Sequence, residues 1–271
     1  MARLSIEAAG LTDAGTVRQF NEDSIVFDAG LGIMALADGM GGHRAGEVAS
    51  RMATESLLAA LRDQMPVIDA DDDPASSQLA VGQSIIRANE AIFAAAQSNP
   101  SYRGMGTTLV MAVFHGGRVL LAHVGDSRIY RLRYNRLQLL TRDDSLLRDQ
   151  VDLGLIEVAD AGGSHNRNLV TRALGIEAHV TPHLRDDEVL AGDVYLLCSD
   201  GLNDLVDDSD IELIMNSLKS NLPLATQHLV QAAKDNGGYD NVSAIRVRLH
   251  EAAATDVHGG WLRRLLAWFQ R

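Results

Sequence analysis

The sequence predicts an α+β domain in which helices stack on the outside of β-sheets. Apolar runs of strand length gather in clusters along the chain, and pairs of long segments rich in alanine and leucine separate those clusters. Alternating and β-branched runs indicate strands, whereas apolar residues at helical spacing indicate amphipathic helices. Elements that each bury one face stack in layers of this kind. The length of 271 residues fits one large domain.

Individual elements follow from the same patterns. Apolar runs bounded by turn residues predict strands at 24–28, 32–37, 107–114, 119–124, 127–133, 137–140, 189–199 and 241–249. Amphipathic segments predict helices at 45–61, 78–96, 208–218 and 223–235, and a polar excursion at 143–175 holds one short helix near 146–153. The dipeptide Tyr134-Asn135 predicts a turn between two of the strands.

Composition limits the class of partner and the compartment. The formal net charge is -12, and a surface of that sign repels phosphate backbones, so no nucleic acid is expected as the main partner. Cys198 is the single cysteine and lies in an apolar run, so we expect a buried small hydrophobe and no internal disulfide. Cysteine scarcity, the lack of a signal peptide and the lack of a long apolar stretch favour a cytoplasmic location.

Four aspartates share one setting, at a point where a predicted strand meets a glycine-containing turn: Asp38, Asp126, Asp200 and Asp240. A strand end holds a side chain rigidly, and glycine lets a backbone or a ligand approach closely. For any single one of them a plain turn is the simpler interpretation, because Asp-Gly is a common turn dipeptide. As a set, carboxylates from distant parts of the chain indicate a cation site, since a cation offsets their repulsion.

A series of short motifs extends this pattern over nearly the whole chain. In order they are Thr12-Asp13-Ala14-Gly15 with Arg18 and Asn21-Glu22-Asp23; Ala37-Asp38-Gly39-Met40-Gly41-Gly42-His43; Gly106-Thr107-Thr108; Val124-Gly125-Asp126-Ser127-Arg128; Leu140-Thr141-Arg142-Asp143-Asp144-Ser145; Thr171-Arg172-Ala173-Leu174-Gly175; Ser199-Asp200-Gly201-Leu202; and Asp240-Asn241-Val242-Ser243. Together they resemble the metal-dependent protein phosphatases of type 2C, in particular their bacterial single-domain members. The resemblance implies a catalytic domain at 1–250 and leaves an amphipathic tail at 251–271.

The resemblance implies a four-layer α-β-β-α sandwich of two mainly antiparallel sheets, with metals in a cleft at one edge. It implies hydrolysis of phosphoserine and phosphothreonine esters by in-line attack of a hydroxide that bridges two divalent cations, Mn or Mg. Two cations lower the pKa of a bound water and neutralise phosphoryl oxygens, and oxygen ligands without a Cys or His cluster suit these metals. Expected partners are phosphorylated proteins and a serine/threonine kinase that the enzyme opposes, and a monomer is expected.

The same resemblance assigns roles to metal ligands. Asp38 is expected to bridge the two metals, with the carbonyl of Gly39 as a further ligand. Asp200 and Asp240 are expected to bind the first metal. Asp126, together with Asp200, matches a third metal site of bacterial relatives.

The remaining candidates are Asp23, Arg18 and His43. Asp23 is expected to be an outer ligand of the second metal through water, and neighbouring Glu22 is the rival for that role. Arg18 matches the arginine that grips the substrate phosphate, and its planar fork suits two phosphate oxygens. His43 is a candidate general acid for the leaving alkoxide; a metal-bound water, or a packing role at the start of a helix, are the alternatives.

Two segments contribute outside the metal site. The excursion 143–175 corresponds to the variable flap of the family, where Asp144 stands in place of a histidine found in many relatives, and where His165 and Asn168 receive no chemical role. The tail 261–271 holds both tryptophans; its apolar residues recur at helical spacing, and its arginines fall mostly between them. As a short basic amphipathic helix it would contact a partner or a membrane surface, or pack on its own domain.

Two readings compete with an active phosphatase. One is a catalytically inactive pseudophosphatase that binds phosphoproteins as a regulator; such relatives normally lose metal carboxylates, whereas Asp38, Asp200 and Asp240 all remain. The other is a different metallohydrolase or a nonenzymatic regulatory domain, for which the ordered motifs would be coincidence.

Overall fold

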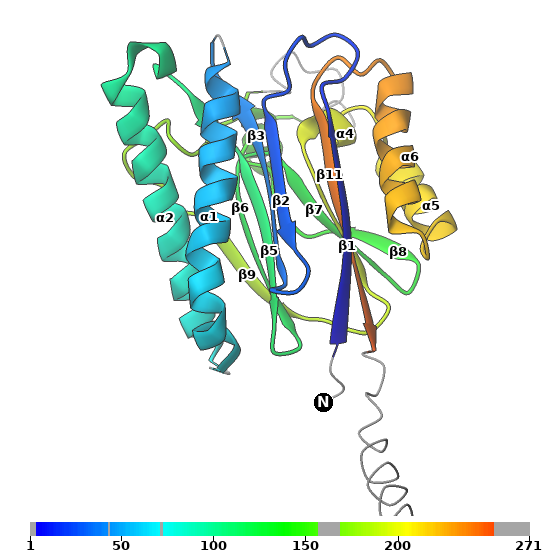
Figure 1. Ribbon diagram of the computed structural model, residues 1–271. Coiled ribbons are helices and arrows are strands. Elements are labelled where there is room, and N and C mark those ends of the chain that lie inside the picture. The colour runs from blue at the N-terminus through cyan, green and yellow to red at the C-terminus, as the bar shows by residue number, and fades with distance from the viewer. Residues whose placement is uncertain (1–3, 43, 71–72, 157–168, 252–271) are drawn as a thin grey trace, which may run out of the picture.

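Two antiparallel sheets form the centre of the molecule (Figure 1). The computed structural model describes residues 4–42, 44–70, 73–156 and 169–251. The first sheet has the order β1-β11-β10-β7-β8, formed by Leu4–Asp13, Val242–Glu251, Val194–Cys198, Arg128–Arg133 and Arg136–Leu139. The second has the order β2-β3-β5-β6-β9, formed by Asp23–Asp28, Ile33–Met40, Leu109–His115, Arg118–Val124 and His183–Glu188. The short β4, Gly106–Thr107, pairs with the end of β3.

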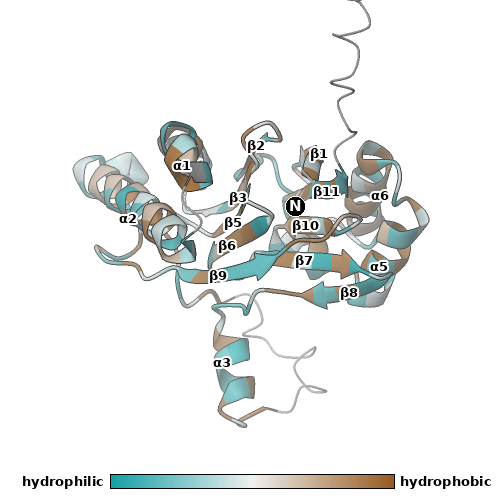
Figure 2. Ribbon diagram, turned by 90° about the horizontal axis from the view of Figure 1, so that it is seen from below, coloured by the Kyte–Doolittle hydropathy of each residue, from teal (hydrophilic) through white to brown (hydrophobic). Residues whose placement is uncertain are grey.

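Helices cover the outer face of each sheet. The second sheet is covered by the two long helices, α1 (Ala45–Ala70) and α2 (Pro74–Ser98), and the 3-10 turn Pro100–Tyr102 follows them. The first sheet is covered by three helices: α4 (Asp200–Asn203), α5 (Asp208–Ser217) and α6 (Leu222–Asp235). One short helix, α3 (Leu146–Asp152), stands outside the layers (Figure 2).

Three apolar layers hold the sandwich together. Between the sheets, side chains such as Leu36, Tyr195 and Ile245 are fully buried. The rings of Phe114 and Tyr195 meet edge to face there, with centroids 5.3 Å apart. The other two layers lie between a sheet and its helices. The predicted four-layer α-β-β-α sandwich of two antiparallel sheets is therefore confirmed.

Most predicted elements are present, and the differences have local causes. The predicted strand 189–199 shortens to β10 because Asp193 closes a turn: its carboxylate accepts from the Leu190 N–H at 2.9 Å, and Gly192 has a φ of 90°. Strands β1 and β9 were missed: β1 alternates only over Leu4, Ile6 and Ala8 before Ala9-Gly10 interrupts the pattern, and β9 is mostly polar. Pairing with β11 and β6 defines them. The predicted turn at Tyr134-Asn135 is confirmed, with φ of 51° and 62°.

Candidate active site

Asp23 and Asp38 face each other across the register of β2 and β3. The carboxylate of Asp23 is buried, and its Oδ2 accepts hydrogen bonds from Ser199 Oγ at 2.9 Å and from Ser243 Oγ at 2.6 Å. Thr12 extends the chain of hydroxyls: its Oγ1 lies 2.7 Å from Ser243 Oγ, and because the one Ser243 proton is donated to Asp23, Thr12 is the donor in this contact. Residues on β1 and β11 of the first sheet, and Ser199 just after β10, therefore hold one oxygen of the Asp23 carboxylate in place.

The backbone of Asp38 is held by the predicted motif Gly106-Thr107-Thr108. The N–H of Asp38 donates to Thr108 Oγ1 at 3.0 Å, and its carbonyl accepts from Thr107 Oγ1 and from the Thr108 N–H, both at 2.8 Å. The next residue, Gly39, has no room for a side chain, since a Cβ there would lie 2.2 Å from the Gly46 carbonyl oxygen. These contacts hold the end of β3 rigidly, so the backbone fixes the direction in which the Asp38 side chain leaves the strand.

Asp200 and Asp126 reach the same region from the segments that follow β10 and β6. Asp200 is the first residue of α4, one residue beyond Ser199, and Gly201 packs against the backbone of Asn241 so closely that a Cβ would meet its carbonyl oxygen at 2.0 Å. Asp126 is buried and follows Gly125, whose φ of 100° and contact with Thr108 favour glycine.

The electrostatics show that these carboxylates converge. Burial raises the pKa of Asp38 well above its ordinary value, and the charges of Asp23 and Asp200 raise it further. Burial also raises the pKa of Asp200, with Asp126 as its strongest charged neighbour. The pKa of Asp23 rises to about 6 through burial, and that of Asp126 to about 7 through burial and the charge of Asp143. Each carboxylate thus titrates in the field of others.

Several buried carboxylate oxygens at this end have no hydrogen-bond donor among the residues that the structure describes. They are Asp23 Oδ1, Asp200 Oδ1 and Glu22 Oε1. An unpaired buried oxygen is costly, and a divalent cation with its waters supplies the missing partner. Carboxylate oxygens are the ligands that hard cations such as Mg²⁺ or Mn²⁺ prefer, so this group of side chains fits them.

Arg18 and Asp240 form an ion pair at the mouth of this group. Arg18 Nη2 lies 2.8 Å from Asp240 Oδ2, and the arginine side chain is 54% exposed. The pair raises the pKa of Arg18, to which the charges of Glu22 and Asp38 also contribute. Asn241 ties the segments together: its side chain accepts from the Glu22 N–H and donates to the carbonyls of Ala14 and Phe20.

The structure thus brings together the predicted Asp23, Asp38, Asp126, Asp200 and Asp240, with Arg18 beside them. His43 lies outside the described residues, as do the flap residues His165 and Asn168 and the tail from 252 onward. The hydroxyls of Ser199 and Ser243, which hold Asp23, received no role from the sequence. Their places inside the motifs Ser199-Asp200 and Asp240-Asn241-Val242-Ser243 were the available signal.

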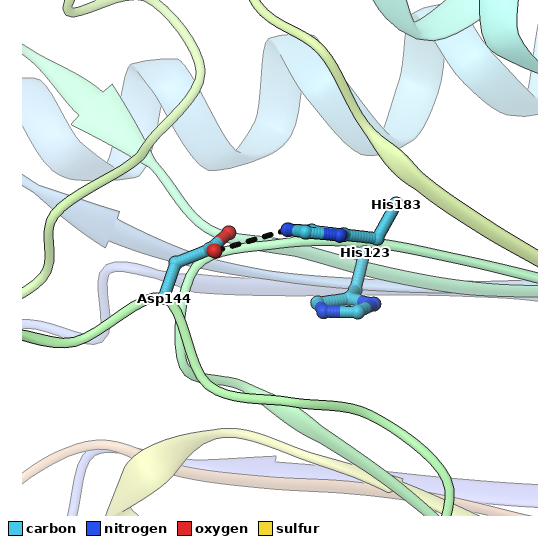
Figure 3. A group of neighbouring side chains, drawn as sticks. All are labelled: His123, Asp144 and His183. Atoms are coloured by element: carbon cyan, nitrogen blue, oxygen red, sulfur yellow. Dashed lines mark hydrogen bonds and ion pairs between the residues drawn. The ribbon is translucent and has the colours of Figure 1, made fainter. Parts of the chain in front are cut away.

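A second polar cluster, consisting of His123, Asp144 and His183, adjoins the site (Figure 3). Asp144 is buried; its Oδ1 lies 3.0 Å from His183 Nε2 and 3.3 Å from Arg172 Nη1, and its Oδ2 accepts from the Gly125 N–H at 3.1 Å. The rings of the two histidines stack with centroids 4.6 Å apart. Within the described residues, this cluster is the one group of three or more His, Cys, Asp or Glu side chains whose possible metal-ligand atoms all lie within 4.8 Å of one another.

The partners of this cluster indicate a scaffold. His123 Nε2 lies 2.9 Å from the carbonyl oxygen of Arg142, and His183 Nε2 lies 2.9 Å from Arg172 Nη1. The guanidinium of Arg172 places a positive charge where a metal would bind. Through Gly125, Asp144 instead braces the loop that carries Asp126. The sequence marked Asp144 only as a departure from the family pattern.

Comparison with known proteins gives the family. A family model described as "Protein phosphatase 2C" matches residues 13–232. The chain belongs to the protein phosphatase 2C family. Its relatives in this family include the serine/threonine protein phosphatase PstP of Mycobacterium tuberculosis, 43% identical over 250 residues that cover 90% of this chain and 46% of the relative. The chain thus spans about half the length of that relative.

Other members of the phosphatase 2C family match over most of both chains. The serine/threonine phosphatase stp of Listeria welshimeri is 37% identical, over 87% of this chain and 93% of the relative. A crystal structure of the PstP catalytic domain "in complex with 2 Manganese ions" superposes with a TM-score of 0.79 at 38% identity, covering 92% of this chain and all of that one (100%).

Among the described residues, no helix has the length and apolar character needed to cross a membrane.

Proposed function

We propose that the chain is a metal-dependent protein serine/threonine phosphatase that hydrolyses phosphoserine and phosphothreonine esters. The observation that carries the proposal is the set of converging buried aspartates beside the exposed guanidinium of Arg18, in which one oxygen each of Asp23 and Asp200 has no hydrogen-bond donor in the described part of the chain. The names of the relatives and the two manganese ions of the PstP structure support the same activity.

The proposed ligands of two divalent cations follow from the geometry and from the family pattern. Asp38 would hold both ions, and the Gly39 carbonyl would be a further ligand. Asp200 and Asp240 would hold the first ion. Asp23 would hold the second through water, because two serines donate to one of its oxygens and the other has no donor among the described residues.

Glu22 and Asp126 are further candidate ligands. A buried oxygen of Glu22 has no donor among the residues that the structure describes, so Glu22 is a second candidate for the outer ligand of the second ion. Asp126 and Asp200 would form a third metal site, since Asp126 is the strongest charged neighbour of Asp200. When bound, the cations would activate a water for in-line attack and neutralise the phosphoryl oxygens.

The chain's own residues would position the substrate and exclude alternative geometries. The planar fork of Arg18 would bind two phosphate oxygens and orient the ester for in-line attack. Asp240 holds Arg18 in place at 2.8 Å. We also propose His43 as the general acid for the leaving alkoxide.

The wider setting belongs to the same proposal. Its substrates would be phosphorylated proteins, and its opposing partner a serine/threonine kinase. We propose a cytoplasmic monomer, a catalytic domain at 1–250 and a tail at 251–271 that contacts a partner or a membrane surface. The net charge of -12 supports the exclusion of nucleic acid.

The test is hydrolysis of p-nitrophenyl phosphate and of a phosphothreonine peptide by the purified protein, with manganese, with magnesium and with excess chelator. We expect turnover that chelation abolishes and that added manganese restores. Absence of turnover with either metal on both substrates would overturn the proposal in favour of a phosphoprotein-binding pseudophosphatase. Loss of manganese-induced thermal stabilisation in Asp38→Asn would test the metal ligands without an activity readout.

A further inference from the structure

Three apolar side chains stand exposed around the mouth of the candidate active site. Val17 is 67% exposed, Phe20 49% and Tyr239 45%. They belong to the two segments that carry Arg18 and Asp240, and each lies within two residues of that ion pair along the chain. Single exposed apolar residues are common, but a group beside a functional site indicates a binding surface.

The two segments are locked to each other, so the exposure is a fixed feature of the folded chain. The Thr16 N–H donates to the Gly238 carbonyl at 2.7 Å, and Thr16 Oγ1 donates to the Gly237 carbonyl at 2.6 Å. Gly15 has a φ of 79°, and a Cβ there would lie 2.1 Å from the Asp240 carbonyl oxygen. A fixed apolar surface binds with less loss of conformational entropy than a mobile loop.

Phe20 is further fixed by Arg44. The guanidinium of Arg44 lies 4.8 Å from the centroid of the Phe20 ring, and the same group forms an ion pair with Glu47 at 2.7 Å. Arg44 has a φ of 70°, a left-handed conformation that is unfavourable for a residue with a side chain. Such strain is commonly found at functional sites. The ring therefore keeps one face on Arg44 and still exposes about half of its surface.

We propose that Val17, Phe20 and Tyr239 form a docking surface for the substrate polypeptide next to its phosphorylated residue, and that this surface selects apolar side chains there. The inference rests on the proposed phosphatase function. When Arg18 holds the phosphate of the substrate, the substrate residues that flank the phosphorylated residue lie over Val17 and Phe20, which are one and two positions from Arg18 in the sequence. The net charge of -12 disfavours an anionic membrane as the occupant.

The experiment uses the full chain with manganese and two phosphothreonine peptides that differ only at the two residues flanking the phosphothreonine, leucine in one and serine in the other. The readout is the ratio of kcat/KM for the two peptides, so any general change in activity cancels. We expect about a fivefold preference for the leucine peptide, since an open surface removes less apolar area from water than a pocket does. Phe20→Ser should reduce the ratio to about one.

Leu213 on α5 provides the matched control, because it is 63% exposed on an element that carries none of the site residues. Leu213→Ser should keep the wild-type ratio. Equal kcat/KM for both peptides in the wild type, or an unchanged ratio in Phe20→Ser, would overturn the proposal.

A failure of the proposed function is recognised separately by the absence of p-nitrophenyl phosphate turnover. In that case fluorescence anisotropy with the same two labelled peptides tests the surface alone. Tighter binding of the leucine peptide that Phe20→Ser abolishes would support the docking surface, and equal affinities would overturn it.

Discussion

Two neighbouring polar groups, the Asp144 cluster and the aspartate group, differ in how their buried carboxylate oxygens are satisfied. In the Asp144 cluster, Oδ1 contacts His183 and Arg172, and Oδ2 accepts from the Gly125 N–H. In the aspartate group formed by Asp23, Asp38, Asp126 and Asp200, oxygens on Asp23 and Asp200 have no donor within the described residues. Removing one partner of a paired buried charge destabilises the fold, whereas a buried carboxylate oxygen without a partner is costly and indicates a ligand. The comparison therefore separates a scaffold from a functional site.

The largest effect is expected at the centre of the aspartate group. Asp38→Asn should lower kcat on the order of a thousandfold, because the amide removes a bridging charge. In chelator it should raise the free energy of unfolding by roughly 1 kcal/mol, since the repulsion that raises the pKa of Asp38 disappears. p-Nitrophenyl phosphate turnover and urea unfolding measure the two changes. Retained activity would contradict the bridging role.

The opposite sign is expected in the scaffold. Asp144→Ala should lower the free energy of unfolding by about 2–3 kcal/mol, because it leaves the Gly125 N–H and Arg172 without their partner. Urea unfolding in chelator measures the change, and Asp144→Asn is the matched variant that keeps the shape and should lose less. If Asp144→Ala and Asp38→Asn shifted stability in the same direction, the distinction between the two groups would be wrong.

A smaller effect is expected at the exposed edge of the aspartate group. Arg18→Ala should raise KM for p-nitrophenyl phosphate about tenfold with a minor change in kcat, because it removes a contact to the phosphate. Arg18→Lys, which keeps the charge and loses the fork, should fall between the wild type and alanine. Steady-state kinetics with saturating manganese give both constants. An unchanged KM would remove Arg18 from the substrate site.

The smallest expected effect is the pH dependence of the metal-free protein. The pKa is about 6 for Asp23 and about 7 for Asp126, both above the ordinary 3.8. The folded chain therefore holds more protons than the unfolded chain between about pH 4 and 7, and this stabilisation is lost as pH rises through that window. Urea unfolding in chelator should show a loss of at least about 1.4 kcal/mol between pH 5 and 7.5, the amount that the shift of Asp23 alone gives. Saturating manganese should remove this slope, and a rise in stability with pH in chelator would contradict it.

The sequence by itself determined the local structure and the identity of the acidic residues. The long helices, the turn at Tyr134-Asn135 and most strands follow from periodicity and turn chemistry, which act over a few residues. The sequence also shows that Asp38 and Asp200 each stand directly before a glycine. The structure gives the reason, since close backbone packing at Gly39 and Gly201 excludes a side chain. The family motifs then predicted the layers that the structure contains.

Tertiary structure decided which groups pair. Nothing local links Asp23 with Ser199 and Ser243, which lie 176 and 220 residues away along the chain. Likewise Asp144 contacts His183, which lies 39 residues away along the chain. This contact shows that Asp144 has a structural role, whereas the sequence showed only a departure from the family pattern. Strands β1 and β9 also depend on their neighbours in the sheet. Register and burial set these partners, and they arise only when distant segments pack, because a carboxylate's pKa and its hydrogen bonds depend on what surrounds it in space.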